Sequence, residues 1–331
     1  MRGNRVAEFA LGVDFGGTKV ESALVGADGL ILPGSRCRRP TGTERSSEEL
    51  VAAVQSVVQG ALAALPTDAA LLGTGIGSAG PIGLLEGVVS PVNIGVWRAF
   101  PLRSVVEGAT AKAGYDTEAI LRLDGLCITL AEMWVGAGQG CSSLMGMVVS
   151  TGVGGGIIAD GRVVSGKTGN AGHIGQIEVA GFTLPGEGCT LEEIASGPHT
   201  VRWAQSRGWK GRTGEDLALS YAMGNETAGL AVMRSASAVG RALASVTTLL
   251  DLDRVVIGGG FSQVTPDYCE LVQAAARKHA LLDYSTGLEI LPTGLGTDGP
   301  LIGAAALVHQ NVGRPMGAVQ CREVFPLEAA T

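Results

Sequence analysis

Residues 11–19 read Leu11-Gly12-Val13-Asp14-Phe15-Gly16-Gly17-Thr18-Lys19 and lead an apolar strand into a glycine turn. The turn carries one acid, one hydroxyl and one base. Adjacent glycines let backbone N–H groups approach a polyphosphate closely, because no Cβ stands in the way. Asp14 is then placed to hold a hydrated Mg²⁺ indirectly, and Thr18 and Lys19 to meet phosphate oxygens. A Gly-Gly turn between two strands is also typical of an ordinary tight hairpin, so both interpretations stay open at this point.

A second segment repeats the plan of the first. Met145–Ser150 predicts an apolar strand, and the glycine-rich turn Thr151–Gly156 follows it. In both segments a second apolar strand and an Asp-Gly turn come next, and short third strands are expected at residues 30–32 and 162–164. Neither turn ends in the Gly-Lys-Ser/Thr of a Walker loop, and both open strands, whereas a dinucleotide fingerprint opens a helix. The repetition therefore predicts two similar halves whose hairpins face one nucleotide.

Composition and charge exclude several classes of protein. The chain has 331 residues, of which 52 are glycine and 46% are hydrophobic, which is enough for two domains with substantial cores. A formal net charge of −7 argues against non-specific nucleic-acid binding, which needs a basic surface. We find neither a membrane span nor the apolar core of a signal peptide, and the six scattered cysteines form no Cys-x-x-Cys pair. We expect a soluble, cytoplasmic protein with free thiols.

Strands and helices are expected to alternate along the chain, which predicts an α/β protein with buried sheets. The region of residues 209–216 is polar and is expected to be a loop. Helical spacing of apolar residues predicts helices at 48–65, 102–113, 125–135, 191–196, 228–250, 266–280 and 299–310, and short apolar runs predict strands at 71–77, 119–123 and 254–257.

Three glycine-rich sites in this order resemble those of the ROK (repressor, open reading frame, kinase) sugar kinases, over about residues 11–307. The resemblance implies the two-domain, actin-like ATPase (ribonuclease H-like) fold, with duplicated βββαβα halves and a cleft between them. It implies a small domain at 1–118, completed by a C-terminal helix at about 300–331, and a large domain at 119–299. ATP and Mg²⁺ are the implied cofactors, and the nucleotide and phosphate contacts are assigned to Asp14, Gly16, Gly17, Thr18, Lys19, Thr151, Gly152, Gly154, Gly258, Gly259 and Gly260.

The catalytic carboxylate is assigned to Asp124, which follows the predicted strand at 119–123. The family's catalytic Asn-Asp pair falls on Leu123-Asp124, so that the Asp is kept and the Asn is lost. A carboxylate there can orient a sugar hydroxyl and accept its proton during phosphoryl transfer. An Asp at this position is also a common N-cap of the following helix, and the two roles do not exclude each other.

The resemblance to the family's sugar pocket is uneven. Sugar contacts are implied for Gly80, Asn93, Asp124, His173, Gln176 and Glu192. His173 and Gln176 stand where relatives have a Glu and a His that both bind the sugar, and a lone His is often only structural. A site built for sugar hydroxyls discriminates through paired polar groups, so these changes together with Leu123 indicate a sugar other than plain glucose.

The family's zinc site is not retained in this sequence. Relatives carry three cysteines before the glutamate that matches Glu192, and these fall on Thr183, Pro185 and Thr190, with Cys189 one position away. Zinc needs about four nitrogen or sulfur ligands, which Gln176 and a single thiol do not supply. We expect no zinc.

The expected activity is ATP-dependent phosphorylation of the 6-hydroxyl of a hexose or aminohexose. The best match among the family's specificities is kanosamine (3-amino-3-deoxyglucose), from antibiotic-precursor synthesis. The alternatives are a glucokinase, an N-acetylhexosamine kinase, and a non-catalytic sugar-binding ROK regulator or pseudokinase. The partners expected are the sugar and ATP, without nucleic acid or membrane, and the resemblance implies a homodimer.

Overall fold

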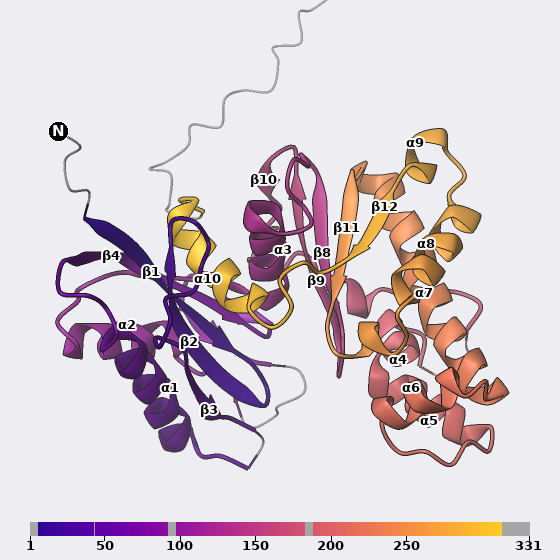
Figure 1. Cartoon of the computed structure of the whole chain (residues 1–331), viewed down its shortest axis with the longest axis horizontal. Coiled ribbons are helices and arrows are strands. Elements are labelled where there is room, and N and C mark those ends of the chain that lie inside the picture. The colour runs from indigo at the N-terminus through magenta and orange to yellow at the C-terminus, as the bar shows by residue number, and fades with distance from the viewer. Residues whose placement is uncertain (1–5, 43, 92–96, 183–187, 313–331) are drawn as a thin grey trace, which may run out of the picture.

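The computed structural model describes residues 6–42, 44–91, 97–182 and 188–312. Its framework is two five-stranded sheets with the same strand order, each made of three antiparallel strands followed by two parallel ones (Figure 1). The predicted duplication is confirmed. The first sheet has the order β3 (Cys37–Pro40), β2 (Lys19–Gly26), β1 (Ala7–Phe15), β4 (Ala69–Ser78), β7 (Ala119–Leu123). The second has the order β10 (Arg162–Val163), β9 (Val153–Ala159), β8 (Leu144–Val149), β11 (Arg254–Gly258), β12 (Glu289–Pro292).

Two strands differ from the expectation. The third strand of the first sheet is β3, whereas residues 30–32 contribute only an isolated bridge between Val25 and Ile31. The division expected after residue 118 assigns residues 119–123 to the second unit, but β7 pairs in parallel with β4 and so belongs to the first sheet. Parallel pairing joins strands that are far apart in sequence, so the pattern within a strand does not reveal its neighbour.

The predicted helices are all present, with ends that agree to within three residues. They are α1 (Ser47–Leu62), α2 (Leu102–Lys112), α3 (Asp124–Val135), α4 (Leu191–Ala195), α7 (Glu226–Leu250), α8 (Tyr268–His279) and α10 (Gly299–His309). The sequence did not predict α5 (Gly197–Ser206), α6 (Gly214–Ala222), α9 (Asp283–Thr286), the short hairpin of β5 (Ile82–Gly83) and β6 (Val88–Val89), or the 3₁₀ turns η1 (Ile174–Gln176) and η2 (Phe261–Gln263). Among the helices within the described ranges, none combines the length and apolar character needed to cross a bilayer.

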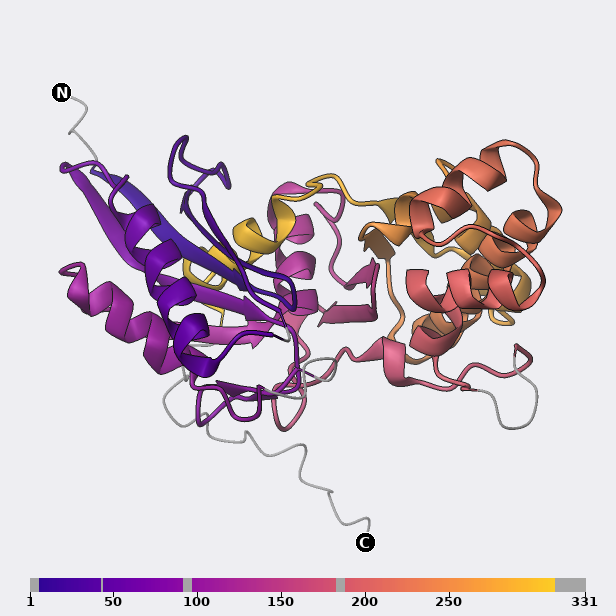
Figure 2. The same cartoon turned by 90° about the horizontal axis from the view of Figure 1, so that it is seen from below.

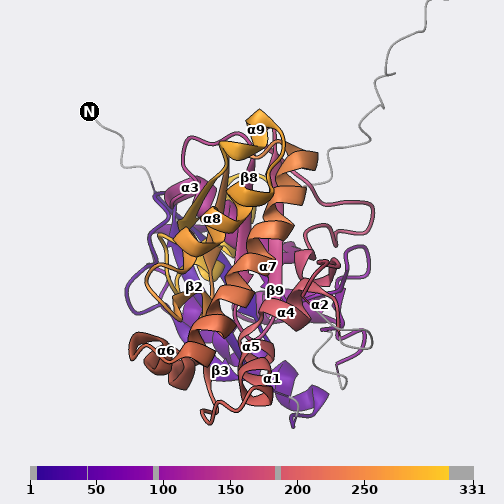
Figure 3. The ribbon, with the colours of Figure 1, turned by 90° about the vertical axis from the view of Figure 1, so that its right-hand side faces the viewer.

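Helices α10 and α3 lie between the two sheets, while the other long helices cover the outer faces (Figures 1 and 2). Helix α10 packs on β1 and β4, α3 packs on β8 and β9, and the two helices contact each other. The end view shows α7 and α8 over the outer side of the second sheet (Figure 3). The C-terminal helix α10 thus covers the inner face of the first sheet, and residues 313–331 lie outside the described ranges.

Glycines on the inner faces of the sheets make this close packing possible. A Cβ at Gly12 or Gly75 would overlap the backbone of α10, and one at Gly156 would overlap the backbone of α3. Where the two helices cross, a Cβ at Gly303 would overlap the backbone of Cys127. Much of the unusual glycine content therefore serves helix-to-sheet and helix-to-helix contacts as well as turns.

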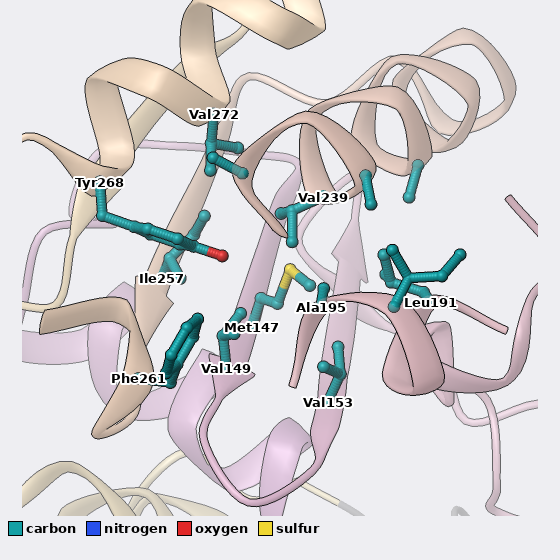
Figure 4. Close-up of a cluster of buried hydrophobic side chains, with 14 of the residues drawn as sticks. Met147, Val149, Val153, Leu191, Ala195, Val239, Ile257, Phe261, Tyr268 and Val272 are labelled. Atoms are coloured by element: carbon teal, nitrogen blue, oxygen red, sulfur yellow. The ribbon is translucent and has the colours of Figure 1, made fainter. Parts of the chain in front are cut away.

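The outer faces of the same strands carry large apolar side chains, because successive residues of a strand point to opposite faces. On β8, Met145, Met147 and Val149 are buried against the helices of the second half, whereas Gly146 faces α3. Figure 4 shows this core, in which Met147 and Val149 meet Val239 of α7 and Ile257 of β11.

A substitution at the crossing of α10 and α3 tests this role of glycine. We expect Gly303→Ala to lower the free energy of unfolding by about 2 kcal/mol or more, because the methyl group would overlap backbone that cannot turn aside. The control is Gly108→Ala in α2, where a Cβ has open space; it should raise that free energy by about 0.5–1 kcal/mol. Urea unfolding of both variants measures the difference, and an equal effect at the two sites would contradict the packing argument.

Candidate active site

The first glycine turn is a tight hairpin that joins β1 to β2. The N–H of Gly16 donates to the carbonyl of Lys19 at 2.9 Å, which closes the turn around Gly17 and Thr18. Thr41 stabilises the turn through two hydrogen bonds. Its N–H donates to the carbonyl of Thr18, and its hydroxyl donates to the carbonyl of Gly16. The hairpin interpretation is therefore correct for the backbone. It is compatible with phosphate binding, because the turn lies next to the carboxyl of Asp14.

The two carboxyls expected to do the chemistry lie on either side of a glycine. Asp14 on β1 is the register partner of Gly77 on β4. A Cβ at Gly77 would lie 3.8 Å from the Cα of Asp124, the first residue of α3. The closer neighbour of such a Cβ is the Sγ of Cys127 at 3.1 Å, so the glycine lets α3 pack tightly on β4. The charge of Asp124 raises the pKa of Asp14, so the two carboxyls lie near each other.

Burial raises the pKa of Asp14 to about 7, with a further contribution from the charge of Asp124. No residue in the described ranges donates a hydrogen bond to the Asp14 side chain, which is 8% exposed. Mg²⁺ in phosphoryl-transfer sites usually takes one or two carboxylates together with substrate phosphates and waters. An uncompensated buried carboxyl fits this demand. Within the described ranges, no group of three or more His, Cys, Asp or Glu side chains is arranged to hold a metal alone.

Asp124 accepts a hydrogen bond from the N–H of Gly125 at 2.7 Å, within the first turn of α3. Leu123 occupies the N-cap position, so Asp124 supports the helix start from inside the helix rather than as the cap. Burial raises the pKa of Asp124, against the opposing effects of that hydrogen bond and the charge of His173. A carboxylate with a raised pKa is a better proton acceptor than a freely solvated one.

Lys19 is engaged by a neighbouring acid. Its ammonium forms an ion pair with Glu21, whose side chain is almost fully buried and also lies 3.5 Å from the Nε of Arg36. Burial raises the pKa of Glu21, but Lys19 and Arg36 outweigh it and lower that pKa overall. The guanidinium of Arg36 also forms an ion pair with Asp298, which immediately precedes α10. This network fixes Lys19 beside Asp14, at the edge of the first glycine turn.

Glu192 binds the second glycine turn rather than standing free. Its Oε2 accepts a hydrogen bond from the N–H of Val153 at 2.8 Å, and its Oε1 lies 3.5 Å from the amide nitrogen of Gln176. A Cβ at Gly152 would lie 2.6 Å from the same carboxylate and would displace it. The structure thus brings Glu192, Gln176 and Gly152 together and links a predicted sugar residue to a predicted phosphate turn. A Cβ at Gly154 would have open space.

The third glycine run forms one wall of a large cavity. Gly258 ends β11, and Gly259 has a φ of +100° and lies so close to β8 that a Cβ would be 2.5 Å from the carbonyl oxygen of Val149. Gly260 and Thr151 line a cavity of about 730 Å³ bounded by η2, α5 and α6. Its size and position beside the second turn suit a nucleoside.

Part of this cavity was missed by sequence reasoning. Arg212, Thr213, Gly214 and Glu215 line it, and they come from the stretch expected to be only a polar loop. Arg202 of α5 lines it as well. The signal that could have found them is the capping box at the start of α6, where Thr213 accepts from the N–H of Asp216 and Asp216 accepts from the N–H of Thr213.

Three of the residues assigned to the sugar lie close together. A Cβ at Gly80 would be 3.1 Å from the Nε2 of His173 and would overlap the side chain of Leu123. His173 also lies near enough to Asp124 to affect the pKa of that carboxyl. Gly80, His173 and Asp124 thus border one region. Asn93 lies outside the described residues.

The positions assigned to the lost zinc ligands have other partners or lie outside the described residues. Thr190 is the N-cap of α4, with its hydroxyl accepting from the N–H of Glu193 at 3.3 Å. Cys189 is partly buried, and none of the five cysteines in the described ranges forms a disulfide. Thr183 and Pro185 fall outside those ranges. The absence of zinc stays a prediction.

Comparison with known proteins adds independent findings. The model of the ROK family matches residues 10–311. A glucokinase of Halalkalibacterium halodurans is 30% identical over 322 residues, covering 91% of this chain and 94% of that protein. An N-acetylmannosamine kinase of Yersinia pseudotuberculosis is 32% identical over 272 residues, covering 81% of this chain and 88% of that protein.

The crystal structure of a ROK family glucokinase from Streptomyces griseus in complex with glucose and AMPPNP is similar throughout. It has a TM-score of 0.75 and 27% sequence identity, and the match covers 91% of this chain and 99% of that one. The similarity therefore extends over both sheets and the helices between them.

The uncompensated burial of Asp14 makes a prediction about stability and pH. In the folded chain Asp14 stays protonated up to a pH of about 7, whereas in the unfolded chain it ionises near its usual value of 3.8. Folding stability should therefore fall as the pH rises from about 4 to about 7. Asp14→Asn removes this penalty, so its free energy of unfolding relative to the parent should rise over that window, by at most about 4 kcal/mol.

Urea unfolding at a series of pH values measures that difference. Asp68→Asn, at an exposed position, is the matched control and should show a pH-independent difference close to zero. A difference for Asp14→Asn that shrinks with rising pH would contradict the assigned protonation state.

Proposed function

This chain belongs to the ROK family, and we propose that it is an ATP-dependent kinase that phosphorylates the 6-hydroxyl of a hexose or aminohexose. The observation that carries the proposal is the pairing of Asp14 and Asp124 across Gly77, between two glycine turns and beside a nucleoside-sized cavity. A binding protein needs no uncompensated carboxyl pair, whereas phosphoryl transfer needs both a proton acceptor and a place for a metal–phosphate complex.

Asp124 is the proposed catalytic base. Its carboxylate lies at the start of α3, where the N–H of Gly125 orients it, and it accepts the proton of the 6-hydroxyl as the phosphoryl group is transferred. Burial, which raises the pKa of Asp124, makes the carboxylate a stronger base.

The nucleotide is proposed to lie with its base and ribose in the cavity beside Thr151 and Gly260. Its phosphates would then reach the turns at Gly16–Lys19 and Thr151–Gly154, where backbone N–H groups and the Lys19 ammonium are available. Mg²⁺ would be held at Asp14, where it would neutralise the phosphate charge. The other residues act by orientation, with Thr41 fixing the first turn and Glu192 the second.

For the substrate we propose an aminohexose, with kanosamine as the specific candidate. The polar groups at this side of the pocket are an imidazole (His173), a carboxamide (Gln176) and a carboxylate (Glu192). An amine needs acceptors, and both His173 and Glu192 can supply them. Glucose and N-acetylhexosamines are the alternatives, and the two relatives named above bear names of those specificities. A homodimer in the cytoplasm is part of this proposal, and light scattering after gel filtration tests the oligomeric state.

A non-catalytic sugar-binding regulator is the second candidate, which the altered sugar residues favour. Asp14, Lys19, Asp124 and the two glycine turns are retained, so the chemistry of transfer has its groups in place. Activity assays separate these candidates.

Replacing the proposed base should abolish most of the turnover. We expect Asp124→Asn to lower kcat by at least about 100-fold, because general-base catalysis contributes on the order of 10²–10⁴. Nucleotide binding, measured by titration calorimetry, should change little. Asp116→Asn, an exposed acid near the start of β7, is the control and should keep the parent rate. An Asp124→Asn enzyme that turns over at the parent rate would overturn the assignment of the base.

A panel of sugars tests the substrate. Coupled ADP-release assays with glucose, mannose, glucosamine, N-acetylglucosamine, N-acetylmannosamine and kanosamine should give the highest kcat/KM for kanosamine, because His173 and Glu192 are the acceptors proposed for its amine. A higher value for another sugar would overturn kanosamine but keep the kinase. Turnover of none of them would favour the non-catalytic regulator.

A further inference from the structure

One side chain joins the two halves of the molecule beside the proposed sugar pocket. The Oδ1 of Asn170 accepts a hydrogen bond from the N–H of Ile82 at 2.8 Å, and its Nδ2 donates to the carbonyl of Ile82 at 2.9 Å. Asn170 lies between β10 and η1 of the second half, and Ile82 opens β5 in the first half. The carboxamide thus pairs with a main chain as a neighbouring strand would, and it fixes the segment around Asn170 against the turn at Gly80.

The backbone of the same residue determines the state of His173. The Nδ1 of His173 lies 2.9 Å from the carbonyl oxygen of Asn170. A carbonyl can only accept, so this contact requires the proton on Nδ1. The Nε2 of the neutral ring then carries a lone pair and acts as a hydrogen-bond acceptor.

That acceptor faces the proposed sugar pocket. A Cβ at Gly80 would lie 3.1 Å from Nε2, so the absence of a side chain there leaves the nitrogen accessible. Leu123 borders the same space and offers no polar group. Within the described ranges, no residue donates a hydrogen bond to this Nε2. The nitrogen is therefore an unused acceptor next to the proposed catalytic carboxylate, Asp124.

We propose that Asn170 is a positioning residue that holds His173 as an acceptor, and that His173 Nε2 selects a sugar that presents a hydrogen-bond donor, an amine or a hydroxyl, at that point. The inference rests on the proposed kinase function. An imidazole lone pair receives an N–H group as a carboxylate does, without adding a second negative charge beside Asp124. The proposal therefore reconciles a histidine at this position with an aminohexose substrate.

The protonation of His173 can be measured directly on the parent protein. Two-bond ¹H–¹⁵N correlation spectra distinguish the two neutral forms of the ring, and the signals of His173 are identified by their loss in His173→Gln. We expect Nδ1 to carry the proton and Nε2 to be bare at a pH where the ring is neutral. A proton on Nε2 in the parent protein would overturn the proposal, whatever the outcome of the activity assays.

Removal of the carboxamide tests the positioning role. With kanosamine and with glucose, Asn170→Ala should raise the sugar KM by about tenfold or more, which corresponds to about 1.4 kcal/mol, the worth of one good hydrogen bond. The KM for ATP and the kcat should stay within about threefold. The spectrum of His173 should show a mixture of ring forms.

The matched control is Asn225→Ala, which removes the N-cap of α7, far from His173 in sequence and not in contact with it. It should cost stability while leaving the sugar KM and the His173 spectrum unchanged. A sugar KM within twofold of the parent in Asn170→Ala would overturn the positioning role. If the parent phosphorylates none of the six sugars of the panel, the proposed function fails, and the spectrum of the parent protein still decides the ring form separately.

Discussion

The close crossing of α10 over α3 is the contact on which the rest of the structure depends. At Gly303 and Cys127 the helices touch through backbone, and β1, β4 and β9 approach them through glycines at their inner faces. A side chain at any of these points would push the sheets apart. Because the sheets stand this near, the first turn of α3 reaches Gly77, and Asp124 comes to lie beside Asp14. The geometry of the proposed chemistry is thus a consequence of helix packing at some distance from it.

Sequence reasoning recovered the features that are local. Strand and helix ends follow from apolar periodicity, so that the predicted helices appear with nearly the predicted bounds. The repeated glycine hairpins predicted the duplicated sheets, because the residues that form a hairpin are close together in sequence. The partner of β7 was not foreseeable in this way, since a parallel strand is joined to its neighbour by a distant crossover. The wall of the nucleoside-sized cavity was not predicted either, because α6 buries only Leu217 completely and so carries little of the apolar periodicity that reveals a helix.

Asp14 and Glu21 lie close together in the first sheet, but their pKa values are shifted in opposite directions. Asp14 and Glu21 face each other across β1 and β2. Glu21 is surrounded by Lys19, Arg36 and Arg38, and its pKa is lowered, whereas burial raises the pKa of Asp14 to about 7. The sequence showed both acids but not the opposite shifts of their pKa values. Those shifts depend on where the chain brings Arg36 and Arg38, which lie beside Glu21. The acid left uncompensated is the one that can gain most from an incoming cation.

On the sugar side, the residues act through contacts that reach across the molecule. Glu192 accepts a hydrogen bond from the N–H of Val153 in the second glycine turn and lies 3.5 Å from Gln176, so it connects a proposed sugar residue to a proposed phosphate turn. Asn170 binds Ile82, so the position of His173 is set by the first half, although the histidine belongs to the second. The Nε2 of His173 therefore keeps its orientation only while the distance between the two halves stays the same. Since α10 and α3 set that spacing, the substrate selection and the phosphoryl transfer proposed for this site both depend on the same glycine contacts.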